Sequence, residues 1–228
     1  MPYFYYDWTM ILVIPGLLLG LYAQFKVKST FARYSRVRTK SGLTAEQAAR
    51  ALLSRGGSAN VTISRVNGSL TDHYDPRSNT LRLSDSVYGS DSVAAVGVAA
   101  HECGHALQEH DGYGLLKLRS ALVPVVNIGS SLYLPIFMAG LLFSWEPLQM
   151  VGILCFGLTL LFSLVTLPVE INASKRALGM LEGVLDAEEL QGAKAVLSAA
   201  ALTYLASVIS SALQLLRLIL ISRSRNRD

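Results

Sequence analysis

The chain is poor in cysteine, histidine and charge. Its 228 residues include 2 cysteines and 4 histidines, and only 16% of residues are charged. Two cysteines cannot form a disulfide framework, so we expect Cys103 and Cys155 to be small apolar residues in a reducing compartment. The net charge is +4, but the polar part has no basic stripe with interleaved aromatic residues, which argues against a nucleic-acid partner.

Long uncharged runs are abundant instead. Hydrophobic residues make up 51% of the chain and gather in four blocks, each long enough to cross a hydrocarbon core about 30 Å thick. Too little polar sequence remains to cover four such helices in a soluble core, so the sequence predicts an integral membrane protein. The four blocks are residues 8–25, 121–143, 147–169 and 195–216.

The charges around the first block predict its orientation. No Lys or Arg precedes it and no small-residue cleavage site follows, so it does not resemble a removable secretory signal. Basic residues are concentrated at positions 26–40, which by the positive-inside rule places the chain from Lys26 onward in the cytoplasm. The aromatic residues at 3–6 and Trp8 are then expected at the outer interface.

The last apolar block conflicts with this orientation. A fourth crossing would leave Arg223, Arg225 and Arg227 outside, against the positive-inside tendency. The stronger basic bias at 26–40 can override this, or the helix at 195–216 can lie at the interface or re-enter. The sequence leaves these paths open.

The polar region at 26–119 has the pattern of a small α+β domain. Thr44 and Gln47 form a capping box that opens a helix. An exposed strand edge before a metal-binding helix can pair with an extended peptide, and residues 61–65 or 80–84 are the candidates; the alternative is an ordinary sheet that only packs on the helix. The expected elements are a helix through Leu53, a strand at 60–65, and a hairpin of 70–74 and 80–84 around a turn at 75–79.

Two of the four histidines lie around a glutamate in the run His101-Glu102-Cys103-Gly104-His105. On a helix, His101 and His105 stack on one face, where both can bind a single Zn²⁺. Glu102 lies about 100° further round and can reach a water on the metal as general base. Cys103 points away and is not expected to be a ligand. The alternative is a buried helix whose histidines bond to backbone groups.

The third zinc ligand must come from elsewhere, because catalytic zinc usually takes three protein ligands. His110 and Asp111 fail, since the helix carries them away from the histidine face. Glu170 ends the third apolar block, where a carboxylate needs a partner, and two membrane crossings return it to the side of the motif. The alternative for Glu170 is an interfacial carboxylate that pairs with Arg176.

The motif His101 to Gln108, the segment Leu70-Thr71-Asp72-His73-Tyr74-Asp75-Pro76 and the run Glu170-x-x-Ala173-Ser174 together resemble a known family. The chain is similar from about 44 to 177 to the YugP-type membrane zinc metallopeptidases, distant relatives of the HtpX and CAAX-prenyl-protein peptidases. In the HtpX-like branch the position of Ser174 is usually an aspartate that steadies a ligating histidine, a charge that Ser174 cannot supply. The resemblance implies zinc on His101, His105 and Glu170, with Glu102 as the base.

We therefore expect a mostly α membrane protein with about four transmembrane helices and a small zincin-like (gluzincin) α+β catalytic region. Its expected function is that of a zinc metalloendopeptidase anchored in the cytoplasmic membrane, with its site facing the cytosol, acting on membrane-associated polypeptides. The expected regions are an anchor at 1–25, a catalytic region at 26–119, a transmembrane hairpin at 120–169, a third-ligand helix and loop at 170–194, and a membrane helix with a basic tail at 195–228.

Two alternatives use the same residues differently. An intramembrane protease is disfavoured by the short Ala/Gly-rich lead-in to the motif and by the lack of a later Asn-Pro-Asp-Gly segment. A non-proteolytic membrane scaffold with a structural metal would not need Glu102.

Peptide hydrolysis also needs a donor to the oxyanion besides the metal. The candidates are His73, Tyr74, Tyr88 and Arg176.

Overall fold

The computed structural model describes residues 8–225, so the aromatic residues at 3–6 and Arg227 lie outside the described part. The chain folds as two compact units, each assembled from separate segments. We call them the helical unit and the mixed unit. The described part of the helical unit comprises residues 8–22, 118–167 and 203–225, and the mixed unit comprises residues 23–117 and 168–202.

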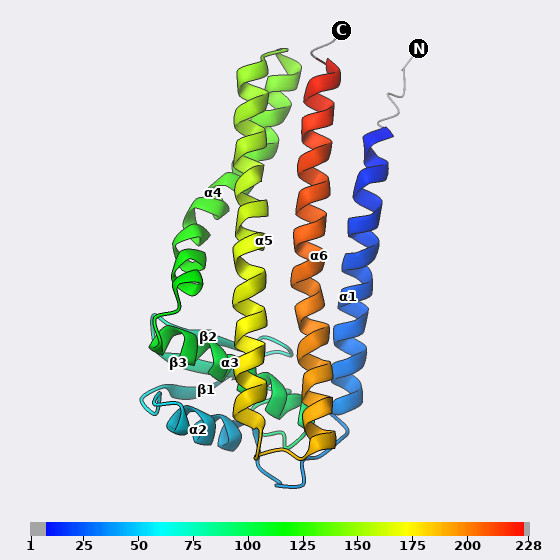
Figure 1. The fold of residues 1–228 in the computed structure, drawn as a ribbon. Helices are drawn as coiled ribbons and strands as arrows, with labels where there is room; N and C mark the ends of the chain where they lie inside the picture. Colours follow the sequence, from blue (N-terminus) through cyan, green and yellow to red (C-terminus); the bar gives the residue numbers. More distant parts are fainter. Residues whose placement is uncertain (1–7, 226–228) are drawn as a thin grey trace. The chain divides into compact units, whose positions relative to one another are not determined.

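Long helices dominate the chain (Figure 1). In chain order, the strands of a small sheet lie between the second and third α-helices. A short 3-10 helix, η1, leads directly into α1. In chain order the elements are η1 (Trp8–Leu12), α1 (Val13–Tyr34), α2 (Ala45–Arg55), β1 (Thr62–Val66), β2 (His73–Asp75), β3 (Thr80–Ser84), α3 (Val93–His110), α4 (Gly114–Leu142), α5 (Glu146–Leu181) and α6 (Ala187–Arg225).

Four helical segments are long and apolar enough to cross a membrane, which confirms the four blocks expected from the sequence. They are longer than those blocks, because helix formation continues through the polar flanks. The described segments are Trp8–Tyr34, Gly114–Leu142, Glu146–Leu181 and Ala187–Ser224. The protein is a mostly helical membrane protein with a small α+β region.

The last helix, α6, is continuous from Ala187 to Arg225. Ser222 near the end of α6 donates its hydroxyl to the Gln149 side chain in the first turn of α5, at 2.7 Å. Thr9 accepts a hydrogen bond from Arg217 at 3.3 Å. Both contacts lie in the last third of α6, which is one unbroken helix within the described residues.

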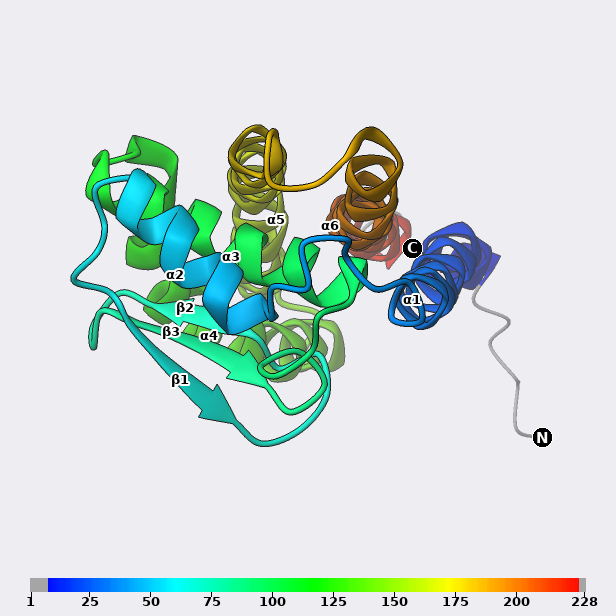
Figure 2. The same ribbon diagram turned by 90° about the horizontal axis from the view of Figure 1, so that it is seen from below.

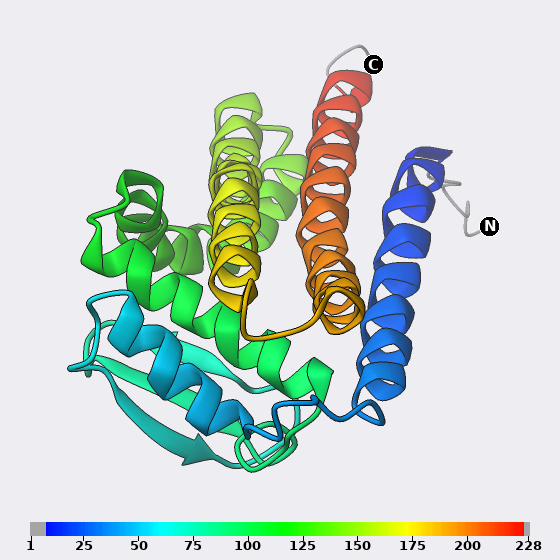
Figure 3. The same ribbon diagram turned by 60° about the horizontal axis from the view of Figure 1, so that its bottom comes forward.

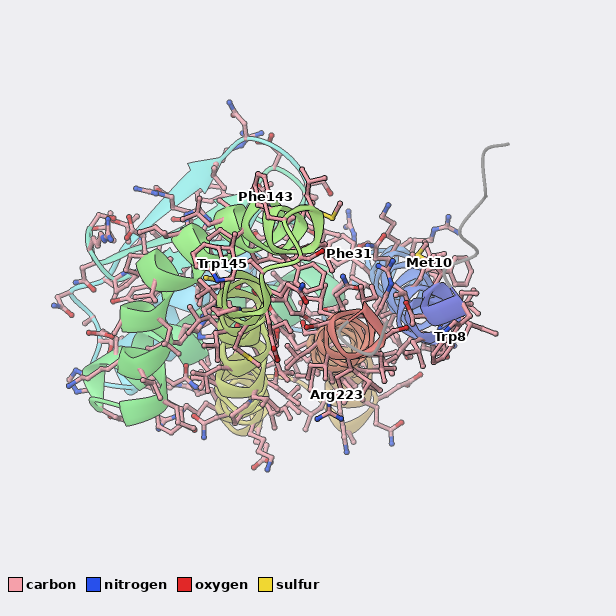
Figure 4. The ribbon with its side chains drawn as sticks, turned by 90° about the horizontal axis from the view of Figure 1, so that it is seen from above. Trp8, Met10, Phe31, Phe143, Trp145 and Arg223 are labelled. Atoms are coloured by element: carbon pink, nitrogen blue, oxygen red, sulfur yellow. The ribbon has the colours of Figure 1, made fainter. Side chains whose placement is uncertain are left out.

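Large side chains are exposed where the helices of the helical unit end. Trp8 lies at the start of η1, and Phe143 and Trp145 lie at the turn between α4 and α5 (Figure 4). Their exposed fractions are 58%, 72% and 57%. Such rings are typical of a membrane interface, where one end meets lipid and the other water.

The sheet of the mixed unit has the strand order β1-β3-β2. β2 and β3 pair antiparallel, with Tyr74 opposite Leu81, as the expected hairpin requires. β1 pairs parallel with β3, so β3 is the central strand, and its Leu81 and Leu83 are fully buried. The expectation that residues 80–84 could offer a free edge is therefore wrong, and the two edges belong to β1 and β2.

Helices α2 and α3 pack together on one face of this sheet (Figure 2). The capping box of Thr44 and Gln47 opens α2, as the sequence predicted. Ser92 caps α3, its hydroxyl accepting the N–H of Ala95. Burial of the apolar faces of α2, α3 and β3 builds the core that holds the motif helix in place.

Candidate metal centre

The two motif histidines on α3 meet Glu170 of α5 within the mixed unit. His101 Nε2 lies 3.2 Å from Glu170 Oε2, and His105 Nε2 lies 3.5 Å from the same oxygen. The two rings are arranged edge to face with their centroids 4.8 Å apart. The structure thus brings together the three residues that the sequence selected as ligands.

This cluster could hold a metal ion. One donor atom from each residue lies within 4.8 Å of the others, and no other such group occurs among the described residues. Two imidazole nitrogens and one carboxylate oxygen match a catalytic zinc site with a fourth position left open. Glu170 is 2% exposed and His105 8%, so these donors are largely withdrawn from competing water.

Gly104 explains how α3 and α5 come so close (Figure 3). A Cβ at this position would lie 2.5 Å from the carbonyl oxygen of Ala173. Ala173 is fully buried, and the absence of a side chain at Gly104 lets the two backbones approach at this crossing. The glycine inside the motif therefore sets the distance between the histidines and Glu170, a role that the motif pattern alone did not reveal.

Each histidine is also held by its second ring nitrogen. His101 Nδ1 lies 3.1 Å from the Ser174 hydroxyl, and His105 Nδ1 lies 3.0 Å from Gln108 Oε1. An amide oxygen can only accept, so His105 Nδ1 carries the proton of this hydrogen bond. Position 174 contacts a histidine of the cluster, as the resemblance implied, but through a neutral hydroxyl.

Gln108 is itself fixed on its other side. Its side-chain amide donates to the Val169 carbonyl and to Asn172 Oδ1, both at 2.9 Å, and the side chain is fully buried. Gln108 thereby ties His105 to α5 next to Glu170. From the sequence alone, Gln108 indicated only that no further histidine ligand follows the motif. Its place three residues after His105, on the same helix face, was the signal available.

Glu102 is buried and faces β2. Its Oε2 accepts the backbone N–H of Tyr74 at 2.9 Å. Tyr74 is paired with Leu81 of β3, yet this N–H points out of the sheet toward α3. The outer edge of β2 therefore lies beside the Glu102 carboxylate, which accepts this N–H.

Cys103 turns away from the histidines. Its thiol lies 3.7 Å from the Ala49 carbonyl of α2, and the side chain is fully buried. Burial raises the pKa of the thiol well above its usual range, and the charge of Glu102 adds to the effect. A thiol that stays protonated and faces α2 is not part of the metal cluster.

Arg176 does not pair with Glu170. It donates to Asn172 Oδ1 at 3.0 Å and forms an ion pair with Asp111, the residue that ends α3. The sequence alternative of an interfacial Glu170–Arg176 pair is therefore wrong. Asp111 faces this arginine, as its position past the histidine face predicted.

The four side chains expected as oxyanion donors all have other partners. Burial raises the pKa of the Tyr74 hydroxyl, with the charges of Glu109 and Asp75 adding to it, so the group stays a donor. It donates to Asn79 at 2.9 Å. Arg176 is bound as described, His73 contacts Thr71 and Arg82, and Tyr88 is hydrogen-bonded to Glu46.

Comparison with known proteins gives the same picture. The family described as "Putative neutral zinc metallopeptidase" matches residues 9–223. A curated relative from Bacillus subtilis (strain 168), named "Putative membrane protease YugP", is 45% identical over 214 residues, which cover 93% of this chain and 95% of the relative. No solved structure matches. Both similarities extend across the membrane helices as well as the motif, and the chain belongs to the family described as "Putative neutral zinc metallopeptidase".

Proposed function

We propose that the protein is a membrane-anchored zinc endopeptidase in which His101, His105 and Glu170 hold the metal and Glu102 is the general base. The observation that carries the proposal is the convergence of both histidine Nε2 atoms on one buried carboxylate oxygen. The alternative of a scaffold with a structural metal gives no role to Glu102, which is buried in a defined contact with β2.

Each side chain of the site has a separate role in peptide hydrolysis. Zinc, when bound, supplies a Lewis acid that polarises the scissile carbonyl and makes the attacking water more acidic. Glu102 takes a proton from that water and passes it to the leaving amine. The Tyr74 N–H donates to the Glu102 carboxylate and fixes its direction. Ser174 and Gln108 keep the histidine rings turned so that their Nε2 atoms face the metal.

The edge of β2 supports an extended polypeptide as the substrate. β2 is an edge strand that lies beside Glu102, and an extended peptide can add to the edge of a sheet by main-chain hydrogen bonds. Glu170 belongs to the membrane-crossing helix α5, which favours segments of membrane proteins at or near the bilayer. The basic residues at 26–40 favour a site on the cytoplasmic side of the cytoplasmic membrane.

The test is Glu102→Gln in the full chain, purified in detergent with zinc. We expect zinc content to match that of the unaltered protein, while cleavage of an unfolded membrane-protein substrate falls by about 10²-fold or more. Glu109→Gln, on the exposed face of the same helix, is the matched control and should leave cleavage unchanged.

Two results would contradict the proposal. Cleavage that survives Glu102→Gln would mean that another group is the base. An unaltered, zinc-loaded chain that cleaves none of a panel of unfolded membrane segments would favour the scaffold.

A further inference from the structure

A cavity of about 330 Å³ lies between α1 and α6 in the mixed unit. The two helices touch at one end of it, where Gly192 packs against the Tyr34 ring so tightly that a Cβ would lie 2.7 Å from it. Beyond that contact the side chains leave a space. α1 lines it with Lys26, Thr30 and Arg33, and α6 lines it with Ser198, Ala199 and Leu202.

The cavity carries positive charge without a counter-ion. Lys26 and Arg33 are two helical turns apart on α1, so both reach the same side of the helix. No carboxylate lines the cavity, and within residues 8–225 neither cation is paired with one. The Arg33 guanidinium lies 5.5 Å above the Tyr34 ring, which restricts its movement without neutralising it.

The rest of the lining changes from polar to apolar along the helices. Lys26 is the first charged residue after the uncharged block of α1, and position 195 opens the uncharged block of α6. The hydroxyls of Thr30 and Ser198 can donate to an anion near the charged end. Ala199 and Leu202 lie further along α6 and give the cavity an apolar wall, which suits a hydrocarbon chain.

We propose that this cavity binds one anionic phospholipid, with its phosphate between Lys26 and Arg33 and its acyl chain against Ala199 and Leu202. The cations give charge complementarity to a phosphate at headgroup depth. The apolar wall distinguishes a lipid from a soluble anion, which would leave that wall uncovered. This inference is independent of the proposed peptidase chemistry, since none of the lining residues belongs to the metal cluster.

The experiment measures retained lipid by native mass spectrometry of the full chain released from bilayers of phosphatidylcholine with phosphatidylglycerol. We expect one tightly held phosphatidylglycerol per chain and no comparable phosphatidylcholine. Lys26→Ala with Arg33→Ala should weaken phosphatidylglycerol binding by about tenfold or more. Lys28→Ala with Arg36→Ala removes the same charge from outside the cavity and should leave it bound.

A second pair of variants tests whether the lipid needs the volume of the cavity, with both cations kept. Ser198→Leu fills the cavity and keeps both cations, so it should also expel the lipid. Ala201→Leu, on the same helix but outside the lining, should not. The proposal is overturned if both double variants lose lipid equally, since that shows diffuse attraction. It is also overturned if Ser198→Leu keeps the lipid, or if inorganic phosphate displaces it, which would indicate a site for a soluble anion.

Discussion

Gly104→Ala should impair zinc binding although the residue donates no ligand. The new Cβ would lie 2.5 Å from the Ala173 oxygen, and contacts of this kind below 3.0 Å are essentially never observed. Helices α3 and α5 must then separate by about 0.5 Å, which exceeds the ~0.2 Å tolerance of zinc–ligand distances. Overpacking of this kind costs about 1–3 kcal/mol, which corresponds to about 5- to 150-fold in zinc affinity if the metal alone must restore the spacing.

The assay is competition for zinc with a chromophoric chelator, performed on purified full-length protein. Gly179→Ala is the matched control, because it lies on α5 with no atom within 4 Å of the added Cβ. That substitution should leave zinc affinity unchanged and stabilise the helix by about 0.5–1 kcal/mol. Unchanged zinc affinity in Gly104→Ala would refute the claim that this crossing sets the distance between the ligands.

Two further substitutions distinguish a residue that positions a histidine of the site from one that does not contact the site. Gln108→Leu removes the acceptor that holds His105 and should weaken zinc binding about 10- to 100-fold. Gln108→Glu keeps an acceptor and should weaken zinc binding less. Chelator competition measures the zinc affinity of both variants. Cys103→Ala should keep full zinc content and cleavage, because its thiol faces α2, and metal loss in this variant would show that the thiol is a ligand.

Local patterns in the sequence were enough to predict the spans and the three clustered residues. The length of an uncharged run decides whether a helix can cross a bilayer, whatever its neighbours do. The spacing of His101 and His105 fixes their common face on any helix. The even number of crossings between Glu170 and the motif predicted that both lie on one side of the membrane. In the structure, Glu170 Oε2 lies 3.2 Å from His101 Nε2.

Features that depend on contacts between distant segments could not be predicted in this way. The parallel pairing of β1 with β3 makes β3 central, and nothing within residues 61–65 or 80–84 specifies that neighbour. The contacts of Gln108 with Val169 and of Gly104 with Ala173 join residues more than sixty positions apart. Their side chains have ordinary chemistry, and only the crossing of α3 with α5 gives them a role.

Zinc content of Glu170→Ala, measured by inductively coupled plasma mass spectrometry after dialysis against a weak chelator, tests the central claim most directly. Glu182→Ala, an exposed glutamate just beyond α5, is the control and should retain one zinc per chain. We expect Glu170→Ala to lose its zinc while remaining folded and monodisperse, because two histidines alone hold the metal weakly. Full zinc occupancy in Glu170→Ala would contradict the account.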